Sequence, residues 1–121
     1  MRMDKIYDIF KVGIGGAGMD ILEIRKKCRD DLIEVTSHIL LRCQQRSISY
    51  KEIKEVILNG EIIEDYPEDY PYPSCLILGY TIGKKVIHVV VGMSETKLWL
   101  ITAYIPDPER WSEDFKTRKE G

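Results

Sequence analysis

One basic stripe gives the chain its first candidate chemistry. His38, Arg42 and Arg46 are spaced four residues apart, which places them on one face of a helix. Arginine guanidinium groups bind anionic oxygens, and a histidine imidazole can give or take a proton near neutral pH. The stripe therefore predicts a face that binds a phosphodiester. A solvated polar face has the same pattern, and the spacing alone does not separate the two.

The second histidine lies in the most apolar segment of the chain. His88 sits in a predicted strand, and alternation along the following strand puts Thr102 and Tyr104 on the same face as Leu98 and Leu100. The hydroxyl groups could then meet His88 across the strands. We expect both imidazoles to converge, with the guanidinium groups, on one hollow open to solvent. The alternative is a core histidine whose hydrogen bonds are satisfied.

A glycine motif precedes the first predicted helix. Gly13, Gly15 and Gly18 match the GxGxxG pattern of dinucleotide-binding folds, in which the backbone approaches a pyrophosphate at a helix N-terminus. Here two further helices follow before any convincing strand, so the parallel βαβ context is missing. We interpret residues 1–18 as an N-terminal extension with a flexible glycine segment, rather than a nucleotide site.

Helices precede strands in the order of predicted elements. Ser49 and Glu52 form a capping box that opens a helix, and Asn59-Gly60 ends it. After Gly60 the hydrophobic period becomes extended. This order predicts an α+β fold in which two to three helices pack on a four-stranded, mainly antiparallel sheet. The predicted helices cover 20–31, 37–46 and 49–59, and the predicted strands cover 61–66, 74–81, 86–91 and 97–104.

Composition describes an ordinary globular domain. Of the 121 residues, 44 % are hydrophobic and 31 % are charged, which suits one domain with a modest core. The formal net charge of −2 divides into +2 over residues 1–60 and −4 over 61–121, so a nucleic-acid contact would need a local basic patch. No run of residues has the length of a membrane span or the pattern of a signal peptide. We expect a cytoplasmic protein.

The three cysteines show neither disulfide nor zinc-site spacing. Cys28, Cys43 and Cys75 are odd in number and form no CxxC pair. We interpret them as reduced and mostly buried thiols. No cofactor and no metal site is expected.

Several segments together resemble a known family. The stretch from residue 19 to about 106 resembles a small prokaryotic family of unknown function grouped with the RelE-like toxin superfamily, which includes MqsR-type mRNA interferases. The resemblance covers about 70 % of the chain. It is carried by HILLR with Arg46, the Ile48-Ser49 pair, and the segments NGEIIEDYP, ILGY, HVVV and ITAYIPD.

This resemblance implies a compact RelE-like domain with helices on a curved antiparallel sheet, over residues 19–106, followed by a polar tail over 107–121. It also implies a metal-independent endoribonuclease, in which the ribose 2′-OH attacks the neighbouring phosphate. That chemistry needs a proton acceptor, a proton donor and cations. The residues that the resemblance brings forward are His38 and His88 for proton transfer, Arg42 and Arg46 for phosphate, and Tyr104 for orientation or proton donation.

The resemblance further implies the toxin of a toxin–antitoxin pair, with RNA as substrate and a zinc-ribbon antitoxin of the MqsA type as partner. Two other interpretations stay open. One is a non-catalytic protein-binding module, indicated by the acidic second half and by Tyr66, Tyr70 and Tyr72, since tyrosine is favoured at interfaces. The other is a small-molecule site at the glycine segment. A homodimer is also expected, through a sheet edge or the apolar N-terminal extension.

Overall fold

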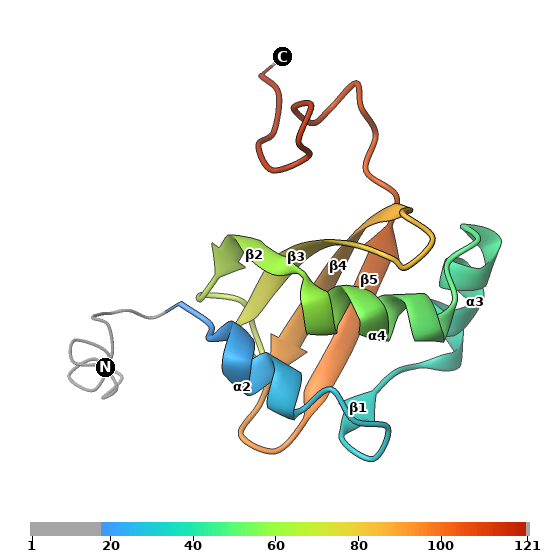
Figure 1. Cartoon of the computed structure of the whole chain (residues 1–121). Coiled ribbons are helices and arrows are strands. Elements are labelled where there is room, and N and C mark those ends of the chain that lie inside the picture. Colours follow the sequence, from blue (N-terminus) through green and yellow to red (C-terminus); the bar gives the residue numbers. More distant parts are fainter. Residues whose placement is uncertain (1–17, 121) are drawn as a thin grey trace.

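The computed structural model of the protein describes residues 18–120. The glycine segment and the predicted extension, apart from Gly18, lie outside these residues. Apart from the short strand β1 (Ile33–Glu34), the helices and strands follow the order that the sequence predicts, and an α+β fold is confirmed (Figure 1). The elements are α2 (Ile21–Lys26), β1 (Ile33–Glu34), α3 (Ser37–Gln45), α4 (Tyr50–Asn59), β2 (Glu61–Tyr66), β3 (Ser74–Tyr80), β4 (Val86–Met93) and β5 (Leu98–Tyr104).

The sheet has five strands in the described part of the chain, in the order β1-β5-β4-β3-β2. β2 to β5 pair antiparallel, as predicted. The prediction of four strands is wrong by one: β1 pairs parallel with the start of β5, through Ile33 opposite Leu98. A strand of two residues is too short to show alternation, so the sequence pattern did not reveal it. The sheet is therefore open and mixed.

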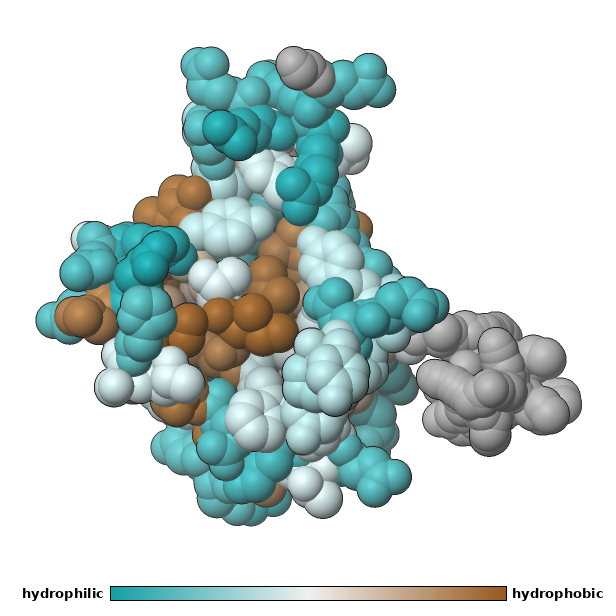
Figure 2. Space-filling model, turned by 180° about the vertical axis from the view of Figure 1, so that it is seen from behind, coloured by the Kyte–Doolittle hydropathy of each residue, from teal (hydrophilic) through white to brown (hydrophobic). Residues whose placement is uncertain are grey.

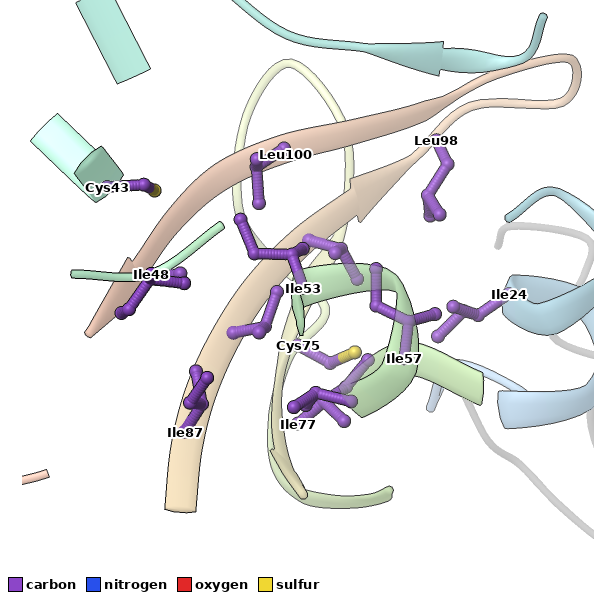
Figure 3. Close-up of a cluster of buried hydrophobic side chains, with 14 residues drawn as sticks. Ile24, Cys43, Ile48, Ile53, Ile57, Cys75, Ile77, Ile87, Leu98 and Leu100 are labelled. Atoms are coloured by element: carbon purple, nitrogen blue, oxygen red, sulfur yellow. The ribbon is translucent and has the colours of Figure 1, made fainter. Parts of the chain in front are cut away.

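The helices cover one face of the sheet, which we call the helix face; the other is the open face (Figure 1). Ile53, Val56 and Ile57 repeat with helical spacing along α4 and are buried against the sheet. Figure 3 shows Ile53 and Ile57 pointing toward Cys75 and Ile77 of β3. The hydrophobic core thus lies between α4 and the central strands.

The two ends of α4 follow the predicted chemistry. The Ser49 hydroxyl accepts from the Glu52 amide at 3.1 Å, and the Glu52 carboxylate accepts from the Ser49 amide at 2.9 Å, so the predicted capping box is confirmed. Gly60 ends the helix where a Cβ would lie 2.5 Å from the Leu78 carbonyl oxygen and 2.6 Å from that of Val56. The chain turns from α4 into β2 through a space that only glycine fits.

A β-bulge in β5 changes which side chains share a face. Val91 pairs with Leu100 but Val90 pairs with Thr102, which leaves Ile101 as an extra residue. Leu100 therefore faces the helices, whereas Thr102 and Tyr104 face the open side with His88. The prediction that all four alternating residues of this strand share a face is wrong, because the extra residue reverses the alternation.

Residues 107–120 pack beyond the end of β5, at the C-terminal end of the chain in Figure 1. Trp111 is buried and forms a bridge with Arg118, so this polar segment closes on itself as a short loop. The side chain of Trp111 covers His88 on the open face, with ring centroids 4.5 Å apart. The segment after the sheet thus becomes part of the packing above β4. None of the helices within residues 18–120 has the length and apolar character needed to cross a bilayer.

Candidate functional site

His88 lies on the open face near the start of β4, and its two ring nitrogens have different partners. Nε2 is 2.9 Å from the carbonyl oxygen of Phe115, and Nδ1 is 3.3 Å from the hydroxyl of Tyr104. A carbonyl oxygen only accepts, so Nε2 carries the proton of the neutral ring and donates to Phe115. Nδ1 is then free to accept from the Tyr104 hydroxyl. The contacts assign one tautomer to the imidazole.

The imidazole is sealed from solvent. His88 is 0 % exposed, and the rings of Trp111 and Tyr104 meet it edge to face. Burial lowers the pKa of His88, against the opposing effects of the Phe115 carbonyl and the nearby Glu64 charge. Burial also raises the pKa of Tyr104. At neutral pH both side chains are uncharged, and His88 holds the Tyr104 hydroxyl in place.

A charged pair lies beside this histidine. Glu64 of β2 accepts from Arg118 twice, from Nε at 2.9 Å and from Nη2 at 3.0 Å. The hydroxyl of Tyr66 donates to the same carboxylate. The Arg118 hydrogen bonds hold the pKa of Glu64 below its usual range, and burial raises the pKa of Tyr66 to about 12. Glu64 is therefore ionised at neutral pH and Tyr66 keeps its proton.

These residues form one group, which we call the open-face cluster: Glu64, Tyr66, His88, Tyr104 and Arg118. Trp111 connects the His88–Tyr104 pair with the group of Glu64, Tyr66 and Arg118. Its ring contacts His88, and the Arg118 guanidinium lies 4.7 Å from the centroid of the same ring. The cluster holds a carboxylate that can accept a proton, phenols that can donate one, and a guanidinium that can bind an anion. It has the parts that acid–base chemistry on a phosphate ester needs.

The predicted site residues divide between two places. His88 and Tyr104 meet, as expected for neighbouring strands. His38 and Arg42 are exposed on α3, on the side of the sheet that the helices cover. Arg46 donates to the Ala103 carbonyl oxygen at 2.8 Å and to the Thr102 hydroxyl at 3.2 Å, at the edge of β5.

The expected convergence of the two imidazoles is therefore wrong. Both faces of β4 are apolar, so alternation could not say which face the helices would cover. The side chains of Ile87, Val89 and Val91 pack under the helices, and His88 points the other way. His38 and His88 lie on opposite sides of the sheet.

Sequence reasoning missed three members of the open-face cluster as chemical groups: Glu64, Tyr66 and Arg118. Glu64 and Tyr66 are two residues apart in the strand EIIEDY, so alternation could have placed them on one face. The bulge after Ile62 shifts their register against β3. Nothing in the sequence marks Arg118 among the charged residues of the tail. Within residues 18–120, no three His, Cys, Asp or Glu side chains gather closely enough to hold a metal ion.

Fold and cluster together define a small α+β domain with acid–base groups on the uncovered face of its sheet. Residues 35–105 match the family described as a domain of unknown function, DUF4258, and the chain belongs to this family. The match includes Glu64, Tyr66, His88 and Tyr104, whereas Arg118 follows it. No curated protein and no solved structure was found to match the chain. The relation to RelE-like toxins stays a prediction.

Proposed function

We propose that the protein is an RNA endonuclease of the mRNA-interferase kind, the toxin of a toxin–antitoxin pair, and that the open-face cluster is its active site. The observation that supports this most directly is the meeting of Glu64, Arg118 and Tyr66 beside the His88–Tyr104 pair. These side chains supply a base, a cation and proton donors within one surface. This is the set that attack by a 2′-OH on a phosphodiester requires.

In this proposal Glu64 is the general base and Arg118 binds the reacting phosphate. The side chain of Arg118 is 61 % exposed, so an RNA phosphate can reach it from solvent. When the guanidinium turns toward the phosphate, Glu64 loses the hydrogen bonds that keep its pKa low. Its carboxylate then becomes a stronger base next to the substrate.

The proton transfers balance within the cluster. Glu64 takes the proton of the 2′-OH, the 2′-oxygen bonds to phosphorus, and the bond from phosphorus to the 5′-oxygen breaks. Tyr66 gives its proton to the leaving oxygen, which is more basic than a phenolate. The hydrogen bond between Tyr66 and Glu64 returns the proton to the phenol. The products are a 2′,3′-cyclic phosphate and a 5′-hydroxyl.

His88 is a positioning residue in this scheme, because it is sealed from solvent and holds Tyr104. The Tyr104 hydroxyl remains the candidate for orienting the phosphate. His38 and Arg42 lie on the exposed side of α3, where we propose that they contact RNA away from the reacting bond. Arg46 is held on β5 by its hydrogen bonds to Thr102 and Ala103. It binds a phosphate only when RNA draws its guanidinium away from that strand.

The test is cleavage of a short RNA in the presence of EDTA, with a matched strand that carries 2′-deoxyribose throughout. We expect cleavage of the RNA alone, with cyclic-phosphate ends. E64Q should slow it by about 100-fold or more, the usual contribution of a general base. E61Q is the matched control on the same strand, since Glu61 pairs with exposed Lys116 outside the cluster. Equal rates for E64Q and E61Q would remove Glu64 from the mechanism.

A second candidate function is a non-catalytic protein-binding module. Two observations favour it: His88 is closed to substrate, and Tyr70 is 94 % exposed in the loop before β3. Absence of cleavage, together with tight binding of a zinc-ribbon antitoxin encoded beside this chain, would support the binding module over the nuclease.

A further inference from the structure

An aromatic hollow lies on the open face, at the opposite end of the strands from the start of β4. Figure 2 shows apolar surface across the middle of this face, between polar segments. The hollow measures about 340 Å³. It is lined mainly by rings and apolar groups: Tyr70, Pro71, Tyr72, Trp99, Leu100 and Ile101, with Gly92 and Asp69. We call it the aromatic hollow.

Two rings form a ready stacking surface in this hollow. Tyr72 and Trp99 lie nearly parallel, with centroids 5.5 Å apart and planes inclined by 19°. Gly92 leaves room in the hollow beside Trp99, because a Cβ there would lie 3.3 Å from the Ile101 side chain and 3.9 Å from Trp99. Flat apolar surfaces of this kind bind other flat rings by stacking. For nucleobases this stacking depends little on which base is bound.

Polar groups at the hollow suit a ring with hydrogen-bonding edges. The Trp99 indole nitrogen is shielded from water and has no acceptor among residues 18–120. Leaving such a donor unpaired is unfavourable, so a bound ring with an acceptor at its edge gains a hydrogen bond if Trp99 turns to bring this nitrogen to it. Asp69 contributes a carboxylate, one oxygen of which accepts from Ser74. The other oxygen can accept from an amino group.

The hollow shares its face with the open-face cluster. Gly92 and His88 lie on the same face of β4, four residues apart, which corresponds to about 13 Å along a strand. A short single strand of RNA can span this distance. A volume of about 340 Å³ also suits one planar group, being near the lower end of the roughly 300–1,000 Å³ typical of small-molecule sites. A protein partner would need a far larger contact.

We infer that the aromatic hollow binds a nucleobase of single-stranded RNA, one with an exocyclic amino group, whose backbone runs along the open face to Arg118. This inference rests on the proposed function, since it supplies a base site for the same substrate. The base stacks on the outer face of one ring of the Tyr72–Trp99 pair, and Asp69 accepts from its amino group. Adenine, cytosine or guanine then binds more tightly than uracil.

The test measures binding separately from cleavage. Fluorescein-labelled tetranucleotides with 2′-O-methyl riboses cannot be cleaved by 2′-OH attack, and their anisotropy reports binding. We expect Y72L to weaken binding of the adenine tetramer by about 5- to 150-fold, the range for loss of one base–aromatic stack. G92V, which fills the hollow without needing an unusual backbone, should weaken it similarly. Y80L is the matched control, because Tyr80 is exposed on the same face outside the hollow.

The outcomes separate the two proposals. Equal binding of the adenine tetramer by Y72L, G92V and Y80L overturns the base site. Weaker binding by Y72L and G92V, without cleavage of ordinary RNA by the wild type, supports the base site and overturns the nuclease. D69N should remove the preference for adenine over uracil, and an unchanged preference contradicts the role given to Asp69.

Discussion

Replacement of His88 by phenylalanine tests whether one buried imidazole ties the C-terminal segment to the sheet. H88F keeps an aromatic ring under Trp111 but removes the hydrogen bond to the Phe115 carbonyl and the one from the Tyr104 hydroxyl. It is a sharp single change, because the two hydrogen bonds of His88 join β4 to β5 and to the residues after β5. We expect a clear loss in the free energy of unfolding.

The size of this loss follows from the contacts. Each of the two hydrogen bonds is worth about 1 kcal/mol, and each partner left without one costs part of its desolvation. Phe115 and Tyr104 are half-buried, so this second cost is only partial. The larger phenyl ring adds some strain in a packed site. Together these give about 2–4 kcal/mol, or roughly 8–16 °C in Tm at this chain length.

Urea unfolding followed by tryptophan fluorescence measures this difference. H38F is the matched control, since the same substitution then falls on an exposed residue of α3 and should change the free energy by no more than about 0.5 kcal/mol. Trypsin should also cut H88F faster after the lysines and arginines of residues 107–120. If H88F and H38F are equally stable, the imidazole does not hold this segment, and its hydrogen bonds carry no net stability.

Three further predictions concern the rest of the fold. Burial lowers the pKa of His88, so the unfolded chain binds more protons below about pH 6.5, and the free energy of unfolding should fall between pH 7 and pH 5; urea titrations should show a weaker fall in H88F. S49A removes one half of the capping box and should cost about 1 kcal/mol in thermal unfolding, where no change would exclude a role for this cap. G60A forces a Cβ against two backbone carbonyls and should cost about 3 kcal/mol or more; normal stability would mean that the turn after α4 relaxes freely.

Periodicity and capping predicted most of the architecture. The three helices within residues 18–120 are capped at their N-termini by Asp20, Thr36 and Ser49, whose side chains accept from amides of the first turn, and these signals are local. The antiparallel strands follow from alternation and short links. The sequence did not predict β1 or the bulge at Ile101, because both arise from pairing with residues that are distant in the sequence.

The candidate site was less predictable than the fold. His88 and Tyr104 were found because they lie on neighbouring strands. Which face the helices cover depends on the relative packing of two apolar faces of β4, and this is a global property of the fold. Arg118 reaches Glu64 across 54 positions of sequence, and no local pattern encodes such a contact.

Arg46 has a consequence for how copies of this protein can join. β1 pairs only with the first two residues of β5, so the remainder of that strand would present bare backbone to a neighbour. The guanidinium of Arg46 occupies the Ala103 carbonyl there, and α3 stands alongside. A foreign strand finds no acceptor at that position and no room to dock. Among residues 18–120, β2 is the longer of the two edge strands, so we expect a pair of molecules that merges two sheets into one to join along its outer side.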